Sequence, residues 1–189
     1  MSTLVFDGET SGLWRAGLPA SDPSQPHLIQ LAAKLYDPRW RVRGAINCLI
    51  FPDGWSIEPQ AEVIHGISEA QCARYGVSLV RALSLFQGLV EQASEIVAFN
   101  LFGFDRQIIS SSIYRAGGTG VWWERKAPAM VCAMEAATPL CGLVGQFGEK
   151  FPTLAEAHRA LVGSPYEGQH DAEHDVDASV RVWRAIKGT

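Results

Sequence analysis

The stretch that decides the fold is LVFDGETSG at residues 4–12. The apolar residues 4–6 predict a buried strand, and the polar residues 7–12 predict a turn after it. Asp7 and Glu9 lie two positions apart, and side chains at that spacing in a strand share one face. Two carboxylates held side by side repel each other unless a cation lies between them. Alone, the motif is typical of an ordinary polar turn. A functional role for its two carboxylates therefore needs support from the rest of the chain.

The hydrophobic pattern on both sides of this stretch predicts an α/β protein. The further predicted elements are strands at 27–36, 42–51, 96–99 and 130–132, short helical turns at 59–74, and helices at 78–92, 104–115, 153–162 and 170–187. Thr153 and Glu156 are spaced as a capping box at the start of the helix at 153–162. The first three strands can pair antiparallel, whereas the later ones need helical crossovers and run parallel. We therefore expect a mixed five-stranded sheet flanked by helices, forming one domain over residues 1–189.

The composition is typical of a globular chain. It has 189 residues, of which 47% are hydrophobic and 19% charged, enough for one domain with a sizeable core. We find no signal peptide and no apolar run that would span a membrane. The four cysteines form no C-x-x-C pair, which favours reduced thiols in a cytoplasmic protein. The net charge of -4 argues mildly against nucleic-acid binding, unless some carboxylates hold metal cations.

Two further acidic clusters follow apolar segments of the chain. Asp105 comes after the predicted strand at 96–99 and begins a predicted helix. Residues 168–175, GQHDAEHD, begin the last predicted helix with three carboxylates and two imidazoles. Helix capping and solvation explain each cluster by itself. Together with Asp7 and Glu9, however, these clusters lie where an α/β sheet presents its ligands.

The residue types in these clusters favour phosphodiester hydrolysis. Carboxylate oxygens are the ligands that suit Mg²⁺ or Mn²⁺. Two such ions about 3.5–4 Å apart stabilise the attacking and leaving oxygens of a phosphodiester displacement. A histidine can then accept the proton of the attacking water.

The motifs resemble those of the DEDD exonucleases, in the histidine-bearing branch called DEDDh or DnaQ-like. Residues 6–13, FDGETSGL, resemble the first exonuclease motif, D-x-E-T-T/S-G-L. Residues 100–105 resemble the second motif, although many members have the aspartate four residues after the asparagine, whereas Asp105 is five residues after Asn100. His170 and Asp175 resemble the third motif, H-x4-D, and residues 65–68 are similar to the H-G-I-T/S turn of the family.

The resemblance implies a ribonuclease H-like fold and a 3′-5′ exonuclease that uses two Mg²⁺ ions, with Mn²⁺ as a substitute. It implies hydrolysis of single-stranded nucleic acid with release of nucleoside 5′-monophosphates. Between the two substrates we favour DNA slightly over RNA. The metal ligands carried over from the motifs are Asp7, Glu9, Asp105 and Asp175, and the general base is His170. The substrate contacts carried over are Thr10, Leu13, His65 and Asn100.

Two other functions stay open at this point. One is a catalytically silent module on the same fold that binds nucleic acid or a polymerase. The other is a zinc hydrolase, because His170 and His174 are four residues apart in a predicted helix and would share a face. The expected partners are 3′ ends of single-stranded DNA or RNA and a DNA polymerase, while the oligomeric state stays open. Candidates for phosphate contacts are Arg106, Arg115, Arg125 and Lys126.

Overall fold

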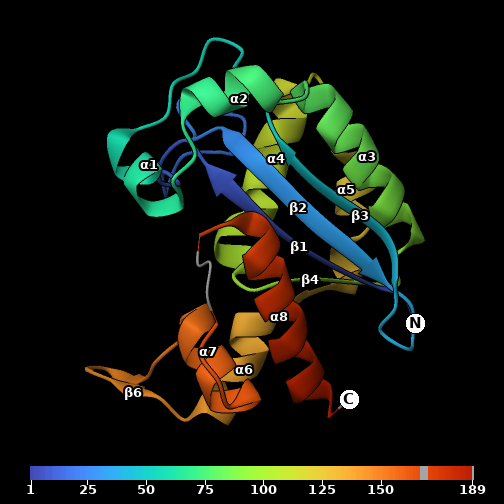
Figure 1. The fold of residues 1–189 in the computed structure, drawn as a ribbon, viewed down its shortest axis with the longest axis vertical. Coiled ribbons are helices and arrows are strands. Elements are labelled where there is room, and N and C mark those ends of the chain that lie inside the picture. The colour runs from blue at the N-terminus through green and yellow to red at the C-terminus, as the bar shows by residue number, and fades with distance from the viewer. Residues whose placement is uncertain (167–169, 189) are drawn as a thin grey trace.

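The computed structural model describes residues 1–166 and 170–188, which are built around a five-stranded sheet of order β3-β2-β1-β4-β5 (Figure 1). β1 pairs antiparallel with β2, and β2 pairs antiparallel with β3. β4 lies parallel to β1, and β5 lies parallel to β4. The predicted mixed sheet is therefore confirmed. The strand bounds are β1 (Thr3–Thr10), β2 (Leu28–Tyr36), β3 (Val42–Leu49), β4 (Glu95–Ala98) and β5 (Met130–Cys132).

Helices cover both faces of this sheet (Figure 1). One hydrophobic cluster joins the sheet to α3 (Leu79–Gln92) and α4 (Arg106–Arg115). A second cluster, on the other face, joins it to α6 (Ala133–Cys141), α7 (Leu154–Val162) and α8 (Ala172–Lys187). The other elements are α1 (Pro59–His65), α2 (Glu69–Tyr75), α5 (Val121–Glu124), a 3₁₀ turn (Ala127–Ala129) and the hairpin β6 (Val144–Gly145) and β7 (Gly148–Glu149).

The alternation of side chains along β1 decides which face carries its acidic residues. Leu4 and Phe6 pack into the cluster with α3 and α4, whereas Val5 packs into the cluster with α8. Successive side chains of a strand point to opposite faces. Asp7 and Glu9 therefore lie on the face of Val5, toward α8.

β1 extends further than the sequence predicted. The predicted turn at residues 7–12 is wrong in its first part, because Asp7 pairs with Ala32 and Glu9 pairs with Gln30 in the ladder to β2. These backbone hydrogen bonds hold both acidic residues in a rigid strand. The strand ends at Thr10, after a register irregularity between residues 9 and 10.

The N-terminus of α7 confirms a predicted capping signal. The Thr153 hydroxyl accepts the backbone N–H of Glu156 at 3.2 Å, and the Glu156 carboxylate accepts the backbone N–H of Thr153 at 2.8 Å. The sequence analysis did not predict α6 or the β6–β7 hairpin. Across residues 1–166 and 170–188, none of the helices has the length and apolar character that a membrane crossing requires.

Candidate active site

Asp105 is presented by a π-helical turn, Leu101–Asp105, that links β4 to α4. A π-helical turn closes over more residues than an α-helical turn, so it accommodates the five-residue spacing from Asn100 to Asp105. Gly103 lies where the Asn100 side chain folds over this turn, and a Cβ atom there would be 2.5 Å from Asn100 Oδ1. Asp105 is buried, with 4% of its surface exposed. The turn therefore delivers a carboxylate to the interior at the end of β4.

The N-terminus of α8 is tied to the sheet by Gln30 of β2, which is 4% exposed. Gln30 Nε2 donates to Asp171 Oδ2 at 3.3 Å, and Gln30 Oε1 accepts the backbone N–H of Ala172 at 3.1 Å. Asp171 Oδ1 accepts two backbone N–H groups of the first turn and so caps the helix. The helix therefore begins at Ala172, and its first turn holds Asp175 against β1.

His170 precedes α8 and does not belong to it, so the predicted helical start at this residue is wrong. Its φ of 64° is in the left-handed region, which histidine adopts more readily than most residues. Its backbone N–H donates to Asp175 Oδ2 at 3.3 Å. His174 is 61% exposed at its side chain, and its Nδ1 lies 3.2 Å from Asp171 Oδ1. The zinc interpretation loses its basis, because His170 and His174 share no helix face.

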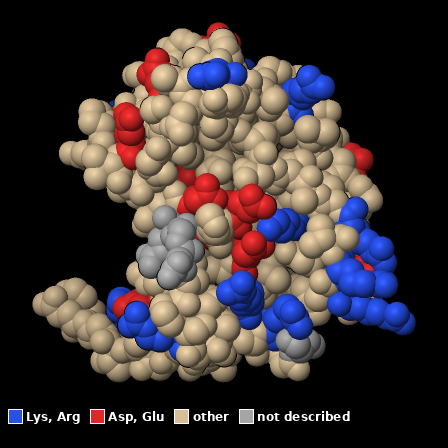
Figure 2. Space-filling view, in the orientation of Figure 1, with Lys and Arg blue, Asp and Glu red and all other residues tan. Residues whose placement is uncertain are grey.

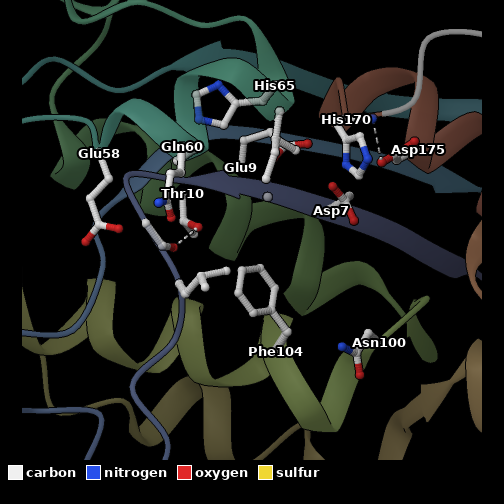
Figure 3. Close-up of a pocket in the computed structure, with 15 residues that line it drawn as sticks. Asp7, Glu9, Thr10, Glu58, Gln60, His65, Asn100, Phe104, His170 and Asp175 are labelled. Atoms are coloured by element: carbon white, nitrogen blue, oxygen red, sulfur yellow. Dashed lines mark hydrogen bonds between the residues drawn. The ribbon is translucent and has the colours of Figure 1, made fainter.

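The acidic residues of β1 and α8 meet at one end of a pocket with a cavity volume of about 360 Å³ (Figure 3). Asp7, Glu9, His170 and Asp175 all line this pocket. One potential ligand atom from each of Glu9, His170 and Asp175 lies within 4.8 Å of the other two. Asp105 is buried beside the pocket, close enough to act on the charges of Asp7 and Asp175.

Burial and mutual repulsion raise the pKa values of these carboxyl groups. The pKa of Asp7 is well above its usual value because of burial first, and then because of Asp105, Asp175 and Glu9. Burial and neighbouring carboxylates raise the pKa of Glu9 to about 7. Burial raises the pKa of Asp105 to about 7 and also raises the pKa of Asp175. The cluster therefore stores electrostatic repulsion that a bound cation would relieve.

The outer surface near this cluster is also acidic. Figure 2 shows acidic side chains gathered at the centre of one face, beside a hollow between α1 and the β6–β7 hairpin. Lys34 of β2 balances part of this charge, since its Nζ lies 2.7 Å from Asp177 Oδ1 and 3.3 Å from Glu173 Oε1. An anionic substrate would meet repulsion at this face unless cations were bound there.

The four residues predicted to contact substrate line the same pocket, namely Thr10, Leu13, His65 and Asn100. The Thr10 hydroxyl donates to the Gly12 carbonyl at 2.8 Å and so shapes the turn after β1. Leu13 is 76% exposed and projects beside the pocket. His65 ends α1, where its Nδ1 accepts a backbone N–H at 3.0 Å. The fold thus brings Thr10 and Asn100, which are 90 residues apart in the sequence, to the same pocket.

Several residues that line the pocket or contact its carboxylates carry no signal in the sequence. Gln60, Ala61 and Ile64 of α1 line it, and Ile64 is 53% exposed, but an exposed apolar residue on a short helix gives no signal before the fold is known. Tyr166 donates its hydroxyl hydrogen to Asp175 Oδ1 at 2.9 Å. Burial raises the pKa of Tyr166, and the negative charge of Asp175 raises it further. The phenol therefore keeps its proton and remains a hydrogen-bond donor. No local pattern marks Tyr166, because its partner is known only from the fold.

Three of the cations predicted to contact phosphate have partners within the protein. The Arg106 guanidinium lies 2.6 Å from Glu124 Oε2. Lys126 Nζ donates to the carbonyls of Glu91 and Ala93 at 3.2 and 2.9 Å. Arg115 donates to backbone carbonyls of residues 23–26. These side chains therefore hold segments of the fold together.

Comparison with solved structures shows that the chain shares the fold of exonuclease I, with the mixed five-stranded sheet that the sequence predicted. The similar structures are those of exonuclease I. The *E. coli* enzyme in complex with a dT13 oligonucleotide matches with a TM-score of 0.78 and 20% identity, over 98% of this chain and 41% of that one. A product-bound exonuclease I matches with a TM-score of 0.76 and 22% identity, over 99% of this chain and 43% of that one.

A zinc-bound form of the *E. coli* exonuclease I complex with single-stranded DNA matches with a TM-score of 0.74 and 20% identity, over 99% of this chain and 40% of that one. The chain thus spans about two fifths of the exonuclease I chains that it matches. No protein-family model and no curated protein matches the sequence. At these identities the likeness establishes the fold.

Proposed function

We propose that the protein is a metal-dependent 3′-5′ exonuclease, with its catalytic domain in residues 1–189. It removes nucleoside 5′-monophosphates from the 3′ end of single-stranded nucleic acid, with DNA favoured over RNA. The observation that carries this proposal is the convergence of three distant segments on one pocket. Asp7 and Glu9 come from β1, Asp105 follows β4, and His170 and Asp175 come from the start of α8. This convergence occurs within the fold of exonuclease I.

The donor set fits the two divalent cations that the motifs imply. Asp7, Glu9, Asp105 and Asp175 supply the carboxylate oxygens that Mg²⁺ and Mn²⁺ prefer. Their raised pKa values indicate uncompensated negative charge, which a cation would balance. We assign these four residues as the metal ligands. When bound, the two ions would supply Lewis-acid stabilisation for the displacement at phosphorus.

Other residues of the pocket bind the terminal nucleotide and transfer the proton. The terminal nucleotide enters between Leu13 and His65, and the turn held by Thr10 shapes the wall beside its sugar. His170 accepts a proton from the attacking water at a ring nitrogen. Its backbone hydrogen bond to Asp175 keeps this ring beside the carboxylates. Attack of the water oxygen on phosphorus breaks the bond to the 3′ oxygen of the preceding nucleotide, which takes up a proton.

The biological setting of the proposed activity follows from more general features. The four cysteines are free, which supports the expectation of a reducing, cytoplasmic environment. The partners that we propose are 3′ ends of single-stranded DNA, RNA as a poorer substrate, and a DNA polymerase whose errors such an enzyme would remove. Some exonuclease I structures contain oligonucleotides, and one contains an SSB C-terminal segment, which supports single-stranded DNA as the substrate here.

Product analysis tests the proposed reaction. The purified protein is incubated with Mg²⁺ or Mn²⁺ and a uniformly labelled single strand, and the products are separated by chromatography. We expect nucleoside 5′-monophosphates from the first time points, and none from a strand whose 3′ end carries a phosphate. Release of 3′-monophosphates or of internal fragments would rule out the proposed reaction. Binding without hydrolysis under either metal would favour the silent binding module.

The thermal stability of the metal-free protein is expected to fall as the pH rises. Glu9 and Asp105 have pKa values near 7 in the fold, against 4.5 and 3.8 as ordinary values. A carboxyl group whose pKa is higher in the folded than in the unfolded state binds its proton more tightly in the fold. Its contribution to stability is fully present below the unfolded-state pKa and is lost as the pH rises through the folded-state pKa. The Tm measured in EDTA should therefore fall between about pH 4 and pH 7.

Two comparisons make this stability measurement specific. Asp105→Asn should flatten the fall, because it removes one of the repelling charges while keeping the side-chain volume. Mn²⁺ at about 100 times its dissociation constant should add about 2.7 kcal/mol to the free energy of unfolding at neutral pH. An equal Tm with and without Mn²⁺ would contradict the assignment of the metal ligands.

Tyr166→Phe is expected to weaken metal binding without unfolding the protein. The substitution removes the hydroxyl group that donates to Asp175 Oδ1 at 2.9 Å, while the ring that packs against His158 is retained. Loss of a hydrogen bond to a metal ligand costs 10- to 100-fold in affinity in comparable sites, so we expect a roughly 10-fold higher dissociation constant for Mn²⁺. Titration calorimetry measures this constant. Tyr114→Phe, a change on the exposed surface of α4, is the matched control.

A further inference from the structure

Two more cavities adjoin the candidate active site. The pocket that holds the carboxylates shares the side chains of Leu13 and Glu58 with a cavity of about 260 Å³. That middle cavity shares His27 and Trp55 with an outer cavity of about 360 Å³. Each cavity therefore shares side chains with the next, so the three are neighbours on the surface. We call the middle and outer cavities together the trough.

Two aromatic rings lie between the middle and outer cavities. The rings of His27 and Trp55 stack with centroids 5.7 Å apart and an interplanar angle of 26°. Trp55 is partly buried and packs against the hydrophobic core, so its ring has a fixed position. Burial lowers the pKa of His27 to about 4, so this imidazole is neutral at physiological pH. The trough is therefore lined by two stacked, uncharged rings, which form its aromatic surface.

Positive charge lies on both sides of this aromatic surface. Arg15 lines the middle cavity, with 55% of its side chain exposed. Arg115 lines the outer cavity and donates to the carbonyls of Pro23, Gln25 and Pro26, so it also fixes the loop that leads to His27.

The N-terminus of the 14-residue helix α3 also lines the outer cavity, through Ser78, Leu79 and Val80. The positive end of a helix dipole attracts phosphate groups. The acidic side chains in the trough are Glu58 and Asp53, and Glu58 lies 3.9 Å from the Arg15 guanidinium. Among the residues that the structure describes, the trough therefore has two arginines and two acids, whereas the pocket of the carboxylates is lined by Asp7, Glu9, Glu58 and Asp175 and by no arginine or lysine.

We propose that the trough binds the single strand on the 5′ side of the scissile phosphate, with one nucleobase stacked on Trp55. This proposal rests on the proposed exonuclease function, because only a polymeric substrate extends beyond the terminal nucleotide pocket. Aromatic stacking and a cationic groove are the two features by which proteins bind single strands without regard to sequence. The trough offers two stacked aromatic rings, two arginines and a helix N-terminus, and it adjoins the pocket of the terminal nucleotide at Leu13 and Glu58.

Trp55→Ala in the full chain tests this proposal by its dependence on substrate length. Kinetics are measured with a single-stranded DNA dodecamer and with the p-nitrophenyl ester of thymidine 5′-monophosphate, which has no nucleotide on the 5′ side of the scissile phosphate. We expect KM for the dodecamer to rise roughly 10-fold with kcat unchanged, since stacking of one base contributes about that factor to binding. KM for the ester should stay at the wild-type value. Trp55→Phe keeps a ring for stacking and should recover most of the affinity for the dodecamer.

Phe147→Ala provides the matched control, because Phe147 is 96% exposed on the β6–β7 hairpin, away from the trough. This variant should bind and cleave the dodecamer like the wild type. Equal KM values of Trp55→Ala and wild type for the dodecamer would overturn the proposal. A KM raised equally for both substrates would also overturn it, because it would indicate a general disturbance of the fold.

A binding measurement separates the trough from the chemistry. Fluorescence anisotropy of a labelled dodecamer in EDTA reports affinity without hydrolysis, and Trp55→Ala should weaken it roughly 10-fold. If the wild-type protein hydrolysed neither substrate, the proposed function would fail, whereas this affinity difference would still support the trough. Equal affinities of the two proteins would overturn the trough even in an active enzyme.

Discussion

Asp7→Asn is expected to lower kcat by about 1000-fold, which corresponds to about 4 kcal/mol of lost transition-state stabilisation. Asp7 is the carboxylate on which Asp105, Asp175 and Glu9 all act, so it lies at the centre of the charge cluster. Asparagine keeps the side-chain volume but removes the negative charge that would hold a cation. The variant should therefore lose Mn²⁺ binding in titration calorimetry together with its activity.

The same substitution should raise the Tm of the metal-free protein, because it relieves the repulsion that raises the pKa of Asp7. This opposite effect on stability and activity separates a functional residue from a structural one. Asp177→Asn, which removes an exposed carboxylate paired with Lys34, is the matched control and should keep its activity. An Asp7→Asn variant with a rate near that of the wild type would refute the metal assignment.

His170→Asn is expected to lower kcat by about 100- to 10,000-fold, the usual contribution of a general base. Asparagine tolerates the left-handed backbone conformation of this residue, so the fold should be retained. It cannot accept the proton of the attacking water. The dissociation constants of Mn²⁺ and of a single-stranded dodecamer should change little, because the four carboxylates are intact. Steady-state kinetics and calorimetry on the same preparation measure both effects.

His174→Ala tests the exclusion of the zinc interpretation of this segment. His174 is exposed and lies beside Asp171, so its removal should leave the activity unchanged. A zinc site built from both histidines would lose activity equally in the two variants. Loss of Mn²⁺ binding in His170→Asn would contradict the role of His170 as a base and would make it a ligand.

Local patterns were enough to predict the sheet and much of the candidate site. Apolar runs interrupted by prolines and glycines gave the five strands, and the side-chain period of two placed Asp7 and Glu9 on one face. The spacing of Thr153 and Glu156 predicted a capping box that the structure contains. The exonuclease motifs then selected residues that come together around one pocket.

Features that depend on distant contacts could not be predicted in the same way. The helical start at His170 was wrong because Asp171 caps α8 with the help of Gln30, which is 141 residues away in the sequence. The turn expected at residue 7 was wrong because β2 extends the ladder to Thr10. Helix α6 was missed because it contains Pro139, which normally argues against a helix interior. Tyr166 and Trp55 carry no motif, and only the fold reveals their neighbours.

A time course with a single-stranded DNA labelled at its 5′ end tests the central claim most directly. The protein is incubated with the strand in Mg²⁺, in Mn²⁺ and in EDTA, beside the Asp7→Asn variant. We predict a ladder of labelled products that shortens one nucleotide at a time from the 3′ end, only with metal and only in the wild type. A strand that stays intact with both metals, or an equal ladder from Asp7→Asn, would contradict it.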